Sequence, residues 1–321
     1  TRSCRGLNFI CIFSYKFLCS VDMVCFNYIS RGKIIKKTNI NNIYKHYKER
    51  NSKLKELNHL ADIFEKYDTF IIDLWGVVHN GVVLNPNAIE AIDQLKKHAK
   101  KIVFLSNAPR PSSNVINFLL KMKMNKRYLE NVMTSGEAAM HAINQKKFGK
   151  TFYHLGPTRD TSIFETVKDN KTDLQRCDFI LCTGLFDEYE NDLNYYKKIL
   201  LKHVSKKLIC TNPDLIVHRG NVEELCAGSV AKVFEDLGGK VIYFGKPHKE
   251  IYNMCFESNE KVLAIGDNLR TDIKGANNLS IDSIFITEGV HRKEFNNFSE
   301  LNKLLGKYNV TANFFQKELK W

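Results

Sequence analysis

From residue 62 onward, short apolar runs rich in β-branched residues alternate with segments whose apolar residues recur at helical spacing. This alternation is typical of a parallel α/β sheet in which each strand leads into a helix. The helical spacing is seen in two segments, first at Ile89, Ile92 and Leu95, then at Val115, Phe118, Leu119 and Met122. The pattern predicts core strands at 70–73, 102–106, 241–244, 262–267 and 284–287.

The second and third of these strands are too far apart for a single crossover, so we expect an inserted domain between them. Further strands are predicted inside this insertion, at 151–155, 179–183 and 208–211. We therefore expect a core built from residues 61–146 and 241–321, with a cap domain at 147–240. No internal repeat stands out.

Residues 1–60 differ from the rest and are predicted to form a basic N-terminal extension. Residues 1–50 carry +8 of the formal net charge of +13. Two interpretations stay open: an organellar targeting segment, or translated flanking sequence with Met23 as the true start. The apolar stretch at 7–29 is interrupted by Lys16 and Asp22, which makes it a poor membrane span.

The charge and the cysteines narrow the function classes. Outside residues 1–50 the chain is only mildly basic, and it carries no recognised nucleic-acid-binding motif, so we expect no nucleic-acid partner. The nine cysteines are scattered without metal-site spacing, which indicates reduced thiols. We expect a cytoplasmic location, with organellar import through the basic segment as the alternative.

Polar residues follow the predicted strands at four places. Asp73 ends the first strand and is followed by Gly76, which allows a sharp turn. The second strand ends in Ser106-Asn107, where a hydroxyl could bind a phosphate oxygen. The third stretch is Gly245-Lys246-Pro247. Each of these alone is weak, because an Asp, a Ser or a Lys at such a position is commonly a cap or a solvated residue.

The fourth stretch, residues 264–276, is the most specific. Asp267 and Asp272 lie five positions apart on a turn that leaves a buried strand. Uncompensated negative charge is costly there unless a cation is bound. Mg²⁺ prefers one or two carboxylates, waters and substrate phosphate oxygens, and Asp73 with Asp267 could supply the carboxylates. Ligands of open α/β sheets bind at these strand ends.

Taken in this order, the four stretches resemble the haloacid dehalogenase superfamily over roughly residues 66–295. The resemblance implies a doubly wound parallel sheet and a Mg²⁺-dependent hydrolase that acts through an aspartyl-phosphate. It also implies a role for each motif residue: Asp73 as the nucleophile, Ser106 binding the phosphoryl group, Lys246 balancing charge, and Asp267 and Asp272 holding Mg²⁺ together with Asp73 and the backbone carbonyl of Trp75.

An inserted cap between the second and third motifs is similar to the class IIA, NagD-like branch, which carries an α/β cap of the C2 type. The runs at 210–214 and 226–229 are also similar to that branch. The resemblance implies a small phosphorylated substrate, such as a nucleotide or sugar phosphate, and a homo-oligomer formed through the cap. The substrate-binding candidates are Asn107, Asp214 and Gly245. Asp214 has the alternative of a turn residue after Pro213.

Trp75 departs from the family pattern. Most phosphatases of the superfamily carry a second Asp there, which protonates the leaving group. Such an acid typically contributes 10²- to 10⁴-fold, so its loss costs about 3 to 5 kcal/mol of barrier. The stretch from Asp73 to His79 resembles a class IIA subgroup that has Trp at this position.

Two consequences of the missing acid stay open. Another group takes over its role, with His79 the nearest candidate, or turnover is slow. A loop role for His79 is the simpler interpretation. Arg110, His218 and Arg219 are further candidates for binding substrate charge, against surface solvation. Phosphomonoester hydrolysis is the leading function. A catalytically weak phosphate-binding or regulatory protein and a phosphotransferase are the alternatives.

Overall fold

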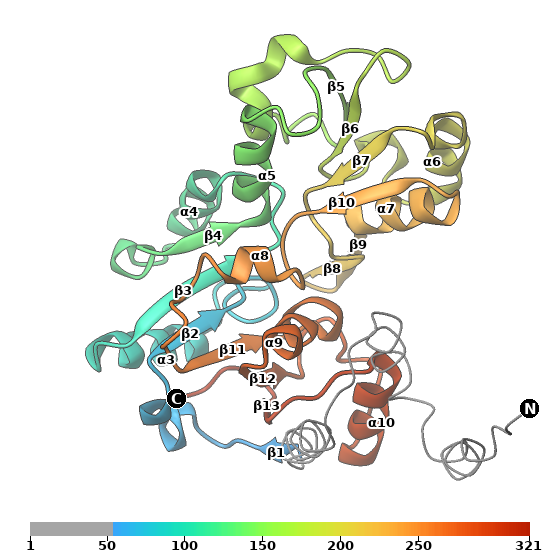
Figure 1. The fold of residues 1–321 in the computed structure, drawn as a ribbon. Helices are drawn as coiled ribbons and strands as arrows, with labels where there is room; N and C mark the ends of the chain where they lie inside the picture. The colour runs from blue at the N-terminus through green and yellow to red at the C-terminus, as the bar shows by residue number, and fades with distance from the viewer. Residues whose placement is uncertain (1–53) are drawn as a thin grey trace, which may run out of the picture. The chain divides into compact units, whose positions relative to one another are not determined.

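The computed structural model describes residues 54–321. The predicted leader and the predicted start at Met23 lie outside the described residues. Residues 53–321 form one compact unit. It contains a larger sheet and a separate smaller sheet (Figure 1). Among residues 54–321, no helix is long and apolar enough to cross a membrane.

The larger sheet has seven strands, all parallel, in the order β1-β13-β12-β11-β2-β3-β4. We call it the core sheet. Its strands are β1 (Lys55–Glu56), β2 (Thr69–Ile72), β3 (Lys101–Ser106), β4 (Val132–Thr134), β11 (Val262–Gly266), β12 (Asp282–Ile286) and β13 (Phe314–Gln316).

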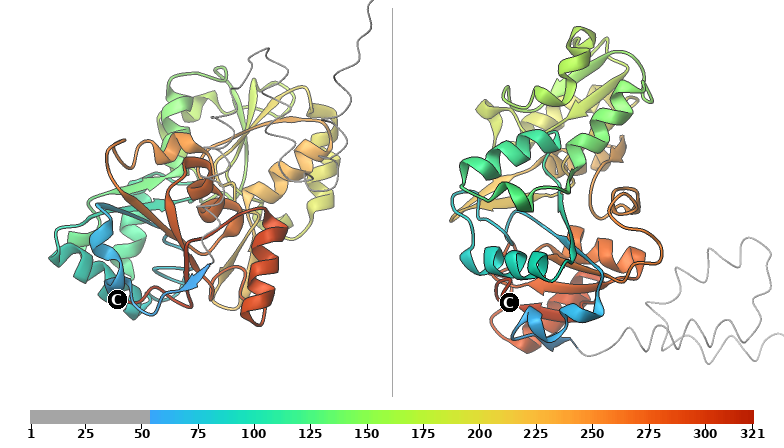
Figure 2. Two further views of the ribbon diagram at one scale, coloured as in Figure 1. Left: turned by 60° about the horizontal axis from the view of Figure 1, so that its bottom comes forward. Right: turned by 90° about the vertical axis from the view of Figure 1, so that its left-hand side faces the viewer.

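Helices cover both faces of the core sheet, which is the predicted doubly wound arrangement (Figure 2). Phe70 and Ile72 of β2 pack on one face with Ile92 of α3 (Pro86–Lys97) and Leu119 of α4 (Ser112–Lys121). Ile71 packs on the opposite face with α8 (Lys249–Tyr252). This alternation follows the period of two along a strand. Helices α9 (Lys274–Leu279) and α10 (Phe298–Tyr308) complete the core.

The smaller sheet has four parallel strands in the order β10-β7-β6-β5 and forms the cap. Its strands are β5 (Phe152–Leu155), β6 (Phe179–Cys182), β7 (Lys207–Cys210) and β10 (Lys240–Tyr243). The helices that pack against this sheet are α5 (Ser135–Asn144), α6 (Leu193–Leu200) and α7 (Ala227–Asp236). An antiparallel hairpin of β8 (Ile216–Arg219) and β9 (Val222–Leu225) lies between β7 and α7 in the chain. We call it the cap hairpin.

The prediction of a core strand at 241–244 is wrong. A strand forms there, but β10 pairs with β7, with Val241 opposite Leu208. Helix α7 carries the chain back beside β7, so β10 pairs there in parallel instead of joining the core sheet. The short strands β1, β4 and β13 of the core were not predicted; β1 and β4 form the two edges of the sheet. We therefore propose that the cap extends through β10 and that the core begins near residue 54 rather than 61.

Candidate active site

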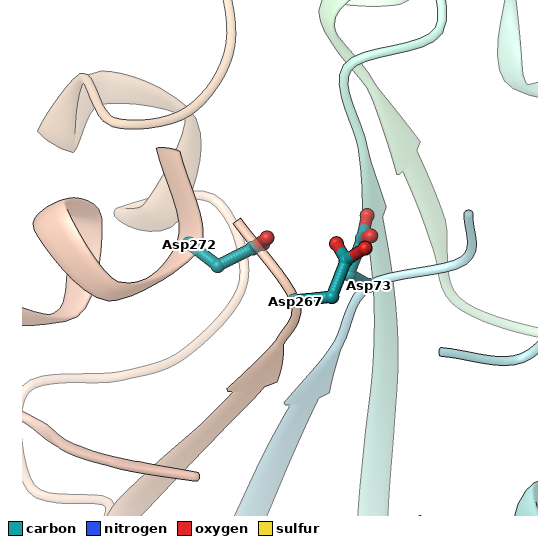
Figure 3. Close-up of side chains that lie close together, drawn as sticks. All are labelled: Asp73, Asp267 and Asp272. Atoms are coloured by element: carbon teal, nitrogen blue, oxygen red, sulfur yellow. The ribbon is translucent and has the colours of Figure 1, made fainter. Parts of the chain in front are cut away.

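Three neighbouring core strands end at the same edge of the sheet. Asp73 follows β2, Asp267 follows β11, and Ser106 ends β3, and β2 lies between the other two strands. Asp272 lies one helical turn further along, in the segment Leu269–Ile273. One carboxylate oxygen from each of the three aspartates lies within 4.8 Å of the others, and all three side chains are buried (Figure 3). The structure thus brings the predicted aspartates together.

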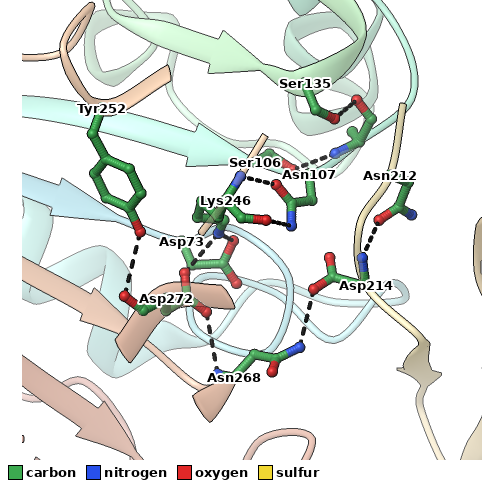
Figure 4. A network of polar contacts seen from close by, with 11 residues as sticks. Asp73, Ser106, Asn107, Ser135, Asn212, Asp214, Lys246, Tyr252, Asn268 and Asp272 are labelled. Carbon is green, nitrogen blue, oxygen red and sulfur yellow. Dashed lines mark hydrogen bonds and ion pairs between the residues drawn. The ribbon is translucent and has the colours of Figure 1, made fainter. Parts of the chain in front are cut away.

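Lys246 joins this group from the segment that returns from the cap. Its Nζ lies 2.6 Å from Oδ1 of Asp73 and 2.7 Å from Oδ1 of Asp272 (Figure 4). Only 2 % of Lys246 is exposed, so the alternative of a solvated lysine before a helix does not hold. The ammonium bridges the two carboxylates.

The backbone of Lys246 is held in place by Asn107. The Lys246 N–H donates to Oδ1 of Asn107 at 2.8 Å, and Nδ2 of Asn107 donates back to the Lys246 carbonyl at 3.2 Å. Gly245 packs directly against the same Asn107 side chain. Both were predicted to bind substrate. In the structure, these contacts fix the segment that presents the lysine, and direct contact with substrate stays a prediction.

Backbone N–H groups orient the other two carboxylates. The N–H of Asn268 donates to Oδ2 of Asp272 at 3.1 Å, and that of Val290 donates to Oδ2 of Asp267 at 2.8 Å. Gly76, at φ +89°, approaches so closely that an added Cβ would lie 2.0 Å from Oδ2 of Asp267. A side chain there would displace the carboxylate, which explains the glycine after the first strand.

Three buried carboxylates face one ammonium, so the site has an excess of negative charge. Burial raises the pKa of Asp73 to about 8 against the lowering effect of Lys246, while Asp272 raises it further. Burial, with Asp73 and Asp272 adding to it, raises the pKa of Asp267 well above its ordinary value. Burial alone would lower the pKa of Lys246, but Asp272 and Asp73 raise it well above its usual range.

This donor set fits a hard divalent cation. Carboxylate oxygens are the ligands that Mg²⁺ prefers, and a divalent charge would offset the excess negative charge described above. Asp73, Asp267 and Asp272 form the one such carboxylate cluster found among residues 54–321.

A cavity of about 650 Å³ opens onto the site between the core and the cap. Ser106 lines it, and its Oγ accepts a hydrogen bond from the Ala108 N–H at 3.2 Å. Asp214, which lies between β7 and β8, faces the same cavity, and Nδ2 of Asn268 donates to its Oδ1 at 3.0 Å. Burial raises the pKa of Asp214 to about 6 against the lowering effect of Lys246. The predicted cap residue therefore lies close to the motif residues.

Trp75 and His79 also line the cavity. The indole N–H of Trp75 donates to the backbone carbonyl of His218 at 2.8 Å. His79 is buried, and its Nδ1 accepts from the Gly81 N–H at 3.0 Å, so Nε2 carries the proton in the neutral ring. Burial, with a further contribution from Arg219, lowers the pKa of His79 to about 4. A neutral imidazole of this kind is a poor proton donor to a leaving group near neutral pH.

The three basic or titratable candidates for substrate charge are engaged with protein groups. Nε of Arg110 lies 2.6 Å from Oδ1 of Asp160, a buried cap residue. Arg219 pairs with Glu224 across the cap hairpin at 2.7 Å, and His218 lies 3.6 Å from Glu223. All of them border the cavity, so they shape its wall.

Two features of the site were missed from the sequence. Asn268 links the two sides through its backbone N–H to Asp272 and its side chain to Asp214. Its place directly after Asp267 was the available signal. The cap hairpin was also missed, because the alternation of apolar and polar residues at 216–225 is short and weak.

Comparison with known proteins agrees with this geometry. Residues 70–168 match the family described as haloacid dehalogenase-like hydrolase, and residues 243–304 match one described as HAD-hydrolase-like. These two segments contain every motif residue of the site described above.

Three relatives illustrate the similarity. The acid sugar phosphatase of Staphylococcus haemolyticus is 26% identical over 238 residues, which cover 70% of this chain and 87% of the relative. The 5'-nucleotidase YutF of Bacillus subtilis is 24% identical over 241 residues, covering 71% and 90%. The crystal structure of a haloacid dehalogenase-like hydrolase from Brucella suis aligns with a TM-score of 0.73 and 28% identity, covering 83% of this chain and 100% of that one. The chain therefore belongs to the haloacid dehalogenase superfamily of hydrolases, in its NagD-like class IIA branch.

Proposed function

We propose that this hydrolase is a Mg²⁺-dependent phosphatase of small phosphorylated metabolites, with Asp73 as its nucleophile. The observation that carries the proposal is the buried contact of Lys246 with both Asp73 and Asp272 beside Asp267, at the floor of the cavity. The names of the relatives, an acid sugar phosphatase and a 5'-nucleotidase, support a sugar phosphate or a nucleotide as the substrate class.

The reaction would proceed in two displacements. A carboxylate oxygen of Asp73 attacks phosphorus, the bond from phosphorus to the ester oxygen breaks, and the leaving alkoxide takes a proton from water. Water then attacks the phosphorus of the aspartyl-phosphate, the bond to the Asp73 oxygen breaks, and phosphate and a proton are released. The first step converts the carboxylate into the aspartyl-phosphate and the second regenerates it, so Asp73 acts as a covalent catalyst.

The chain's own groups prepare these steps. Lys246 favours the ionised form of Asp73 and places positive charge where the phosphoryl oxygens would lie. Ser106, at the end of β3, presents a hydroxyl that could donate to a phosphoryl oxygen. Bound Mg²⁺, held by Asp73, Asp267, Asp272 and the carbonyl of Trp75, would neutralise the carboxylates and the negative charge of the phosphoryl group.

The test is phosphate release from a panel of sugar phosphates, nucleotides and aryl phosphates, with and without Mg²⁺. The parent should release phosphate only with Mg²⁺, and Asp73→Asn should abolish the release. Asp169→Asn, which changes an exposed cap carboxylate, serves as the matched control and should behave as the parent. Equal inactivity of the parent and Asp73→Asn on the whole panel would overturn the proposal.

One observation favours a second candidate, a catalytically weak phosphate-binding or regulatory protein. The Trp75 indole is engaged with the His218 carbonyl and supplies no acid, and His79 is held neutral. This candidate predicts that the parent binds Mg²⁺ with beryllofluoride while Trp75→Asp raises turnover by orders of magnitude. Transfer to an added alcohol, measured in the same assay, would identify a phosphotransferase. A homo-oligomer formed through the cap stays a prediction.

A further inference from the structure

The side chain of Trp75 is in contact with residues of both the core and the cap. His79 packs against the indole with its ring edge, at 5.1 Å between centroids. The Arg219 guanidinium lies over the indole, 5.1 Å from its centroid. Gly81, at φ +84°, lets the backbone pass so close that an added Cβ would meet Cζ2 of Trp75 at 2.5 Å. The indole is therefore closely packed on the side that faces Gly81 and His79.

The core contacts the cap hairpin at three points around its turn. The Trp75 N–H donates to the His218 carbonyl at 2.8 Å, and the Gly220 N–H donates to the Asn80 carbonyl at 3.0 Å. Nη2 of Arg292 lies 3.5 Å from the Gly220 carbonyl. Arg219 extends this network, because it pairs with Glu224 while it covers the indole. Trp75 is therefore the side chain by which the loop after Asp73 hydrogen-bonds to the cap hairpin.

One buried group of the hairpin makes its docking against the core less favourable. Nδ1 of His218 is buried without a hydrogen-bond partner among residues 54–321. Burying an unpaired polar atom is unfavourable. The contacts of Trp75, Asn80 and Arg292 with the hairpin must therefore offset this cost. A ligand that binds the docked arrangement of the hairpin better than an undocked one would shift the balance towards docking.

We propose that Trp75 is a positioning residue: its indole latches the cap hairpin over the cavity and so controls closure of the site, two residues from the nucleophile. The hairpin forms the cavity wall through Ile216, Val217 and His218. A weaker latch leaves the cavity open more of the time, which weakens substrate binding without changing the groups at the floor of the site. Weakening the contact of Trp75 with the hairpin should therefore raise KM and leave kcat nearly unchanged.

The chain offers a direct reporter, because its two tryptophans are Trp75 and Trp321. In a full-length Trp321→Phe protein, the fluorescence of Trp75 alone can be followed. Glu224→Gln in this background frees Arg219 without touching the indole, and it should increase acrylamide quenching of Trp75. Lys232→Gln removes an exposed cap ion pair with Asp236 away from the cavity and should leave quenching unchanged.

The second arm is kinetic and rests on the proposed function. Trp75→Phe keeps an aromatic ring but loses the donor to the His218 carbonyl. It should raise KM by about three- to tenfold, the equilibrium effect of one hydrogen bond, with kcat within about twofold. Trp75→Phe and Arg219→Gln together should raise KM by less than the product of their separate effects, because they belong to one contact network.

The inference is overturned if Glu224→Gln and Lys232→Gln show the same quenching, or if Trp75→Phe leaves KM unchanged or lowers kcat alone. The fluorescence arm needs no turnover. A protein that releases no phosphate but shows the quenching difference would keep the latch and overturn only the phosphatase proposal.

Discussion

The ammonium of Lys246 lies 2.6 Å from a carboxylate oxygen of Asp73, although 173 positions separate the two residues in the chain. The whole cap is inserted between them. The lysine reaches the aspartate because the segment after β10 returns to the core and is fixed by the two hydrogen bonds with Asn107. This contact is also where the excess negative charge of the site is partly balanced.

Lys246→Met should lower both stability and activity. The substitution leaves Asp73 and Asp272 buried without their ammonium partner, and breaking a buried pair in this way costs about 3 to 5 kcal/mol of unfolding free energy. Chemical denaturation in the absence of Mg²⁺ measures it. Lys232→Gln, which removes an exposed ion pair with Asp236, should change the unfolding free energy far less, because solvent screens such a pair. Equal effects of the two substitutions would contradict the buried bridge.

Mg²⁺ should stabilise the folded protein through the aspartate cluster. A ligand at a hundredfold excess over its Kd stabilises by about 2.7 kcal/mol if it binds only the folded state. Asp267→Asn removes one charged ligand but keeps an oxygen that can accept from the Val290 N–H, so it should lose most of this Mg²⁺-dependent increase in Tm. Asp169→Asn should retain it. An identical Mg²⁺-dependent increase in Tm in the parent and in Asp267→Asn would place the cation elsewhere.

Trp75→Asp should change how the rate depends on the leaving group. Without an acid at this position, the parent should favour aryl phosphates, whose leaving groups need no proton, over alkyl phosphates. A carboxylic acid two residues after Asp73 could donate that proton, so the rates on alkyl phosphates should rise by up to about 10² to 10⁴. Rates on p-nitrophenyl phosphate should change far less. A uniform change on both substrate types would argue against a missing acid.

The cap should lose stability in mild acid because of His154. Its ring is buried, with Nε2 2.8 Å from Oγ1 of Thr183. Burial, with a smaller contribution from Lys171, lowers its pKa from 6.5 to about 4. As the pH falls from 6.5 to about 4, the unfolded state takes up a proton that the folded state refuses, so the unfolding free energy decreases.

The full effect of this one group is limited to about 3 kcal/mol. His154→Gln removes the titrating ring while keeping a polar partner for Thr183. Urea denaturation across that pH range should show a shallower loss of stability in the variant than in the parent. Parallel pH profiles would show that His154 does not contribute.

Local sequence patterns determined most of the core strands and the identity of the motif residues. Strands β2, β3, β11 and β12 were predicted because continuous apolar runs mark strands buried on both faces. Asp73, Ser106 and Asp267 could be placed because parallel strands end at one edge of the sheet, whatever the details of packing. The inserted cap followed from the length of chain between the motifs.

Tertiary structure alone decided the rest. Strand β10 has the same apolar pattern as a core strand, and only its pairing with β7 assigns it to the cap. The role of Trp75 was equally invisible, because its partners, His218 and Arg219, lie more than 140 positions away in a hairpin with a weak pattern. Apolar periodicity reports which side of an element is buried, whereas strand partners and contacts between distant loops depend on how the whole chain packs.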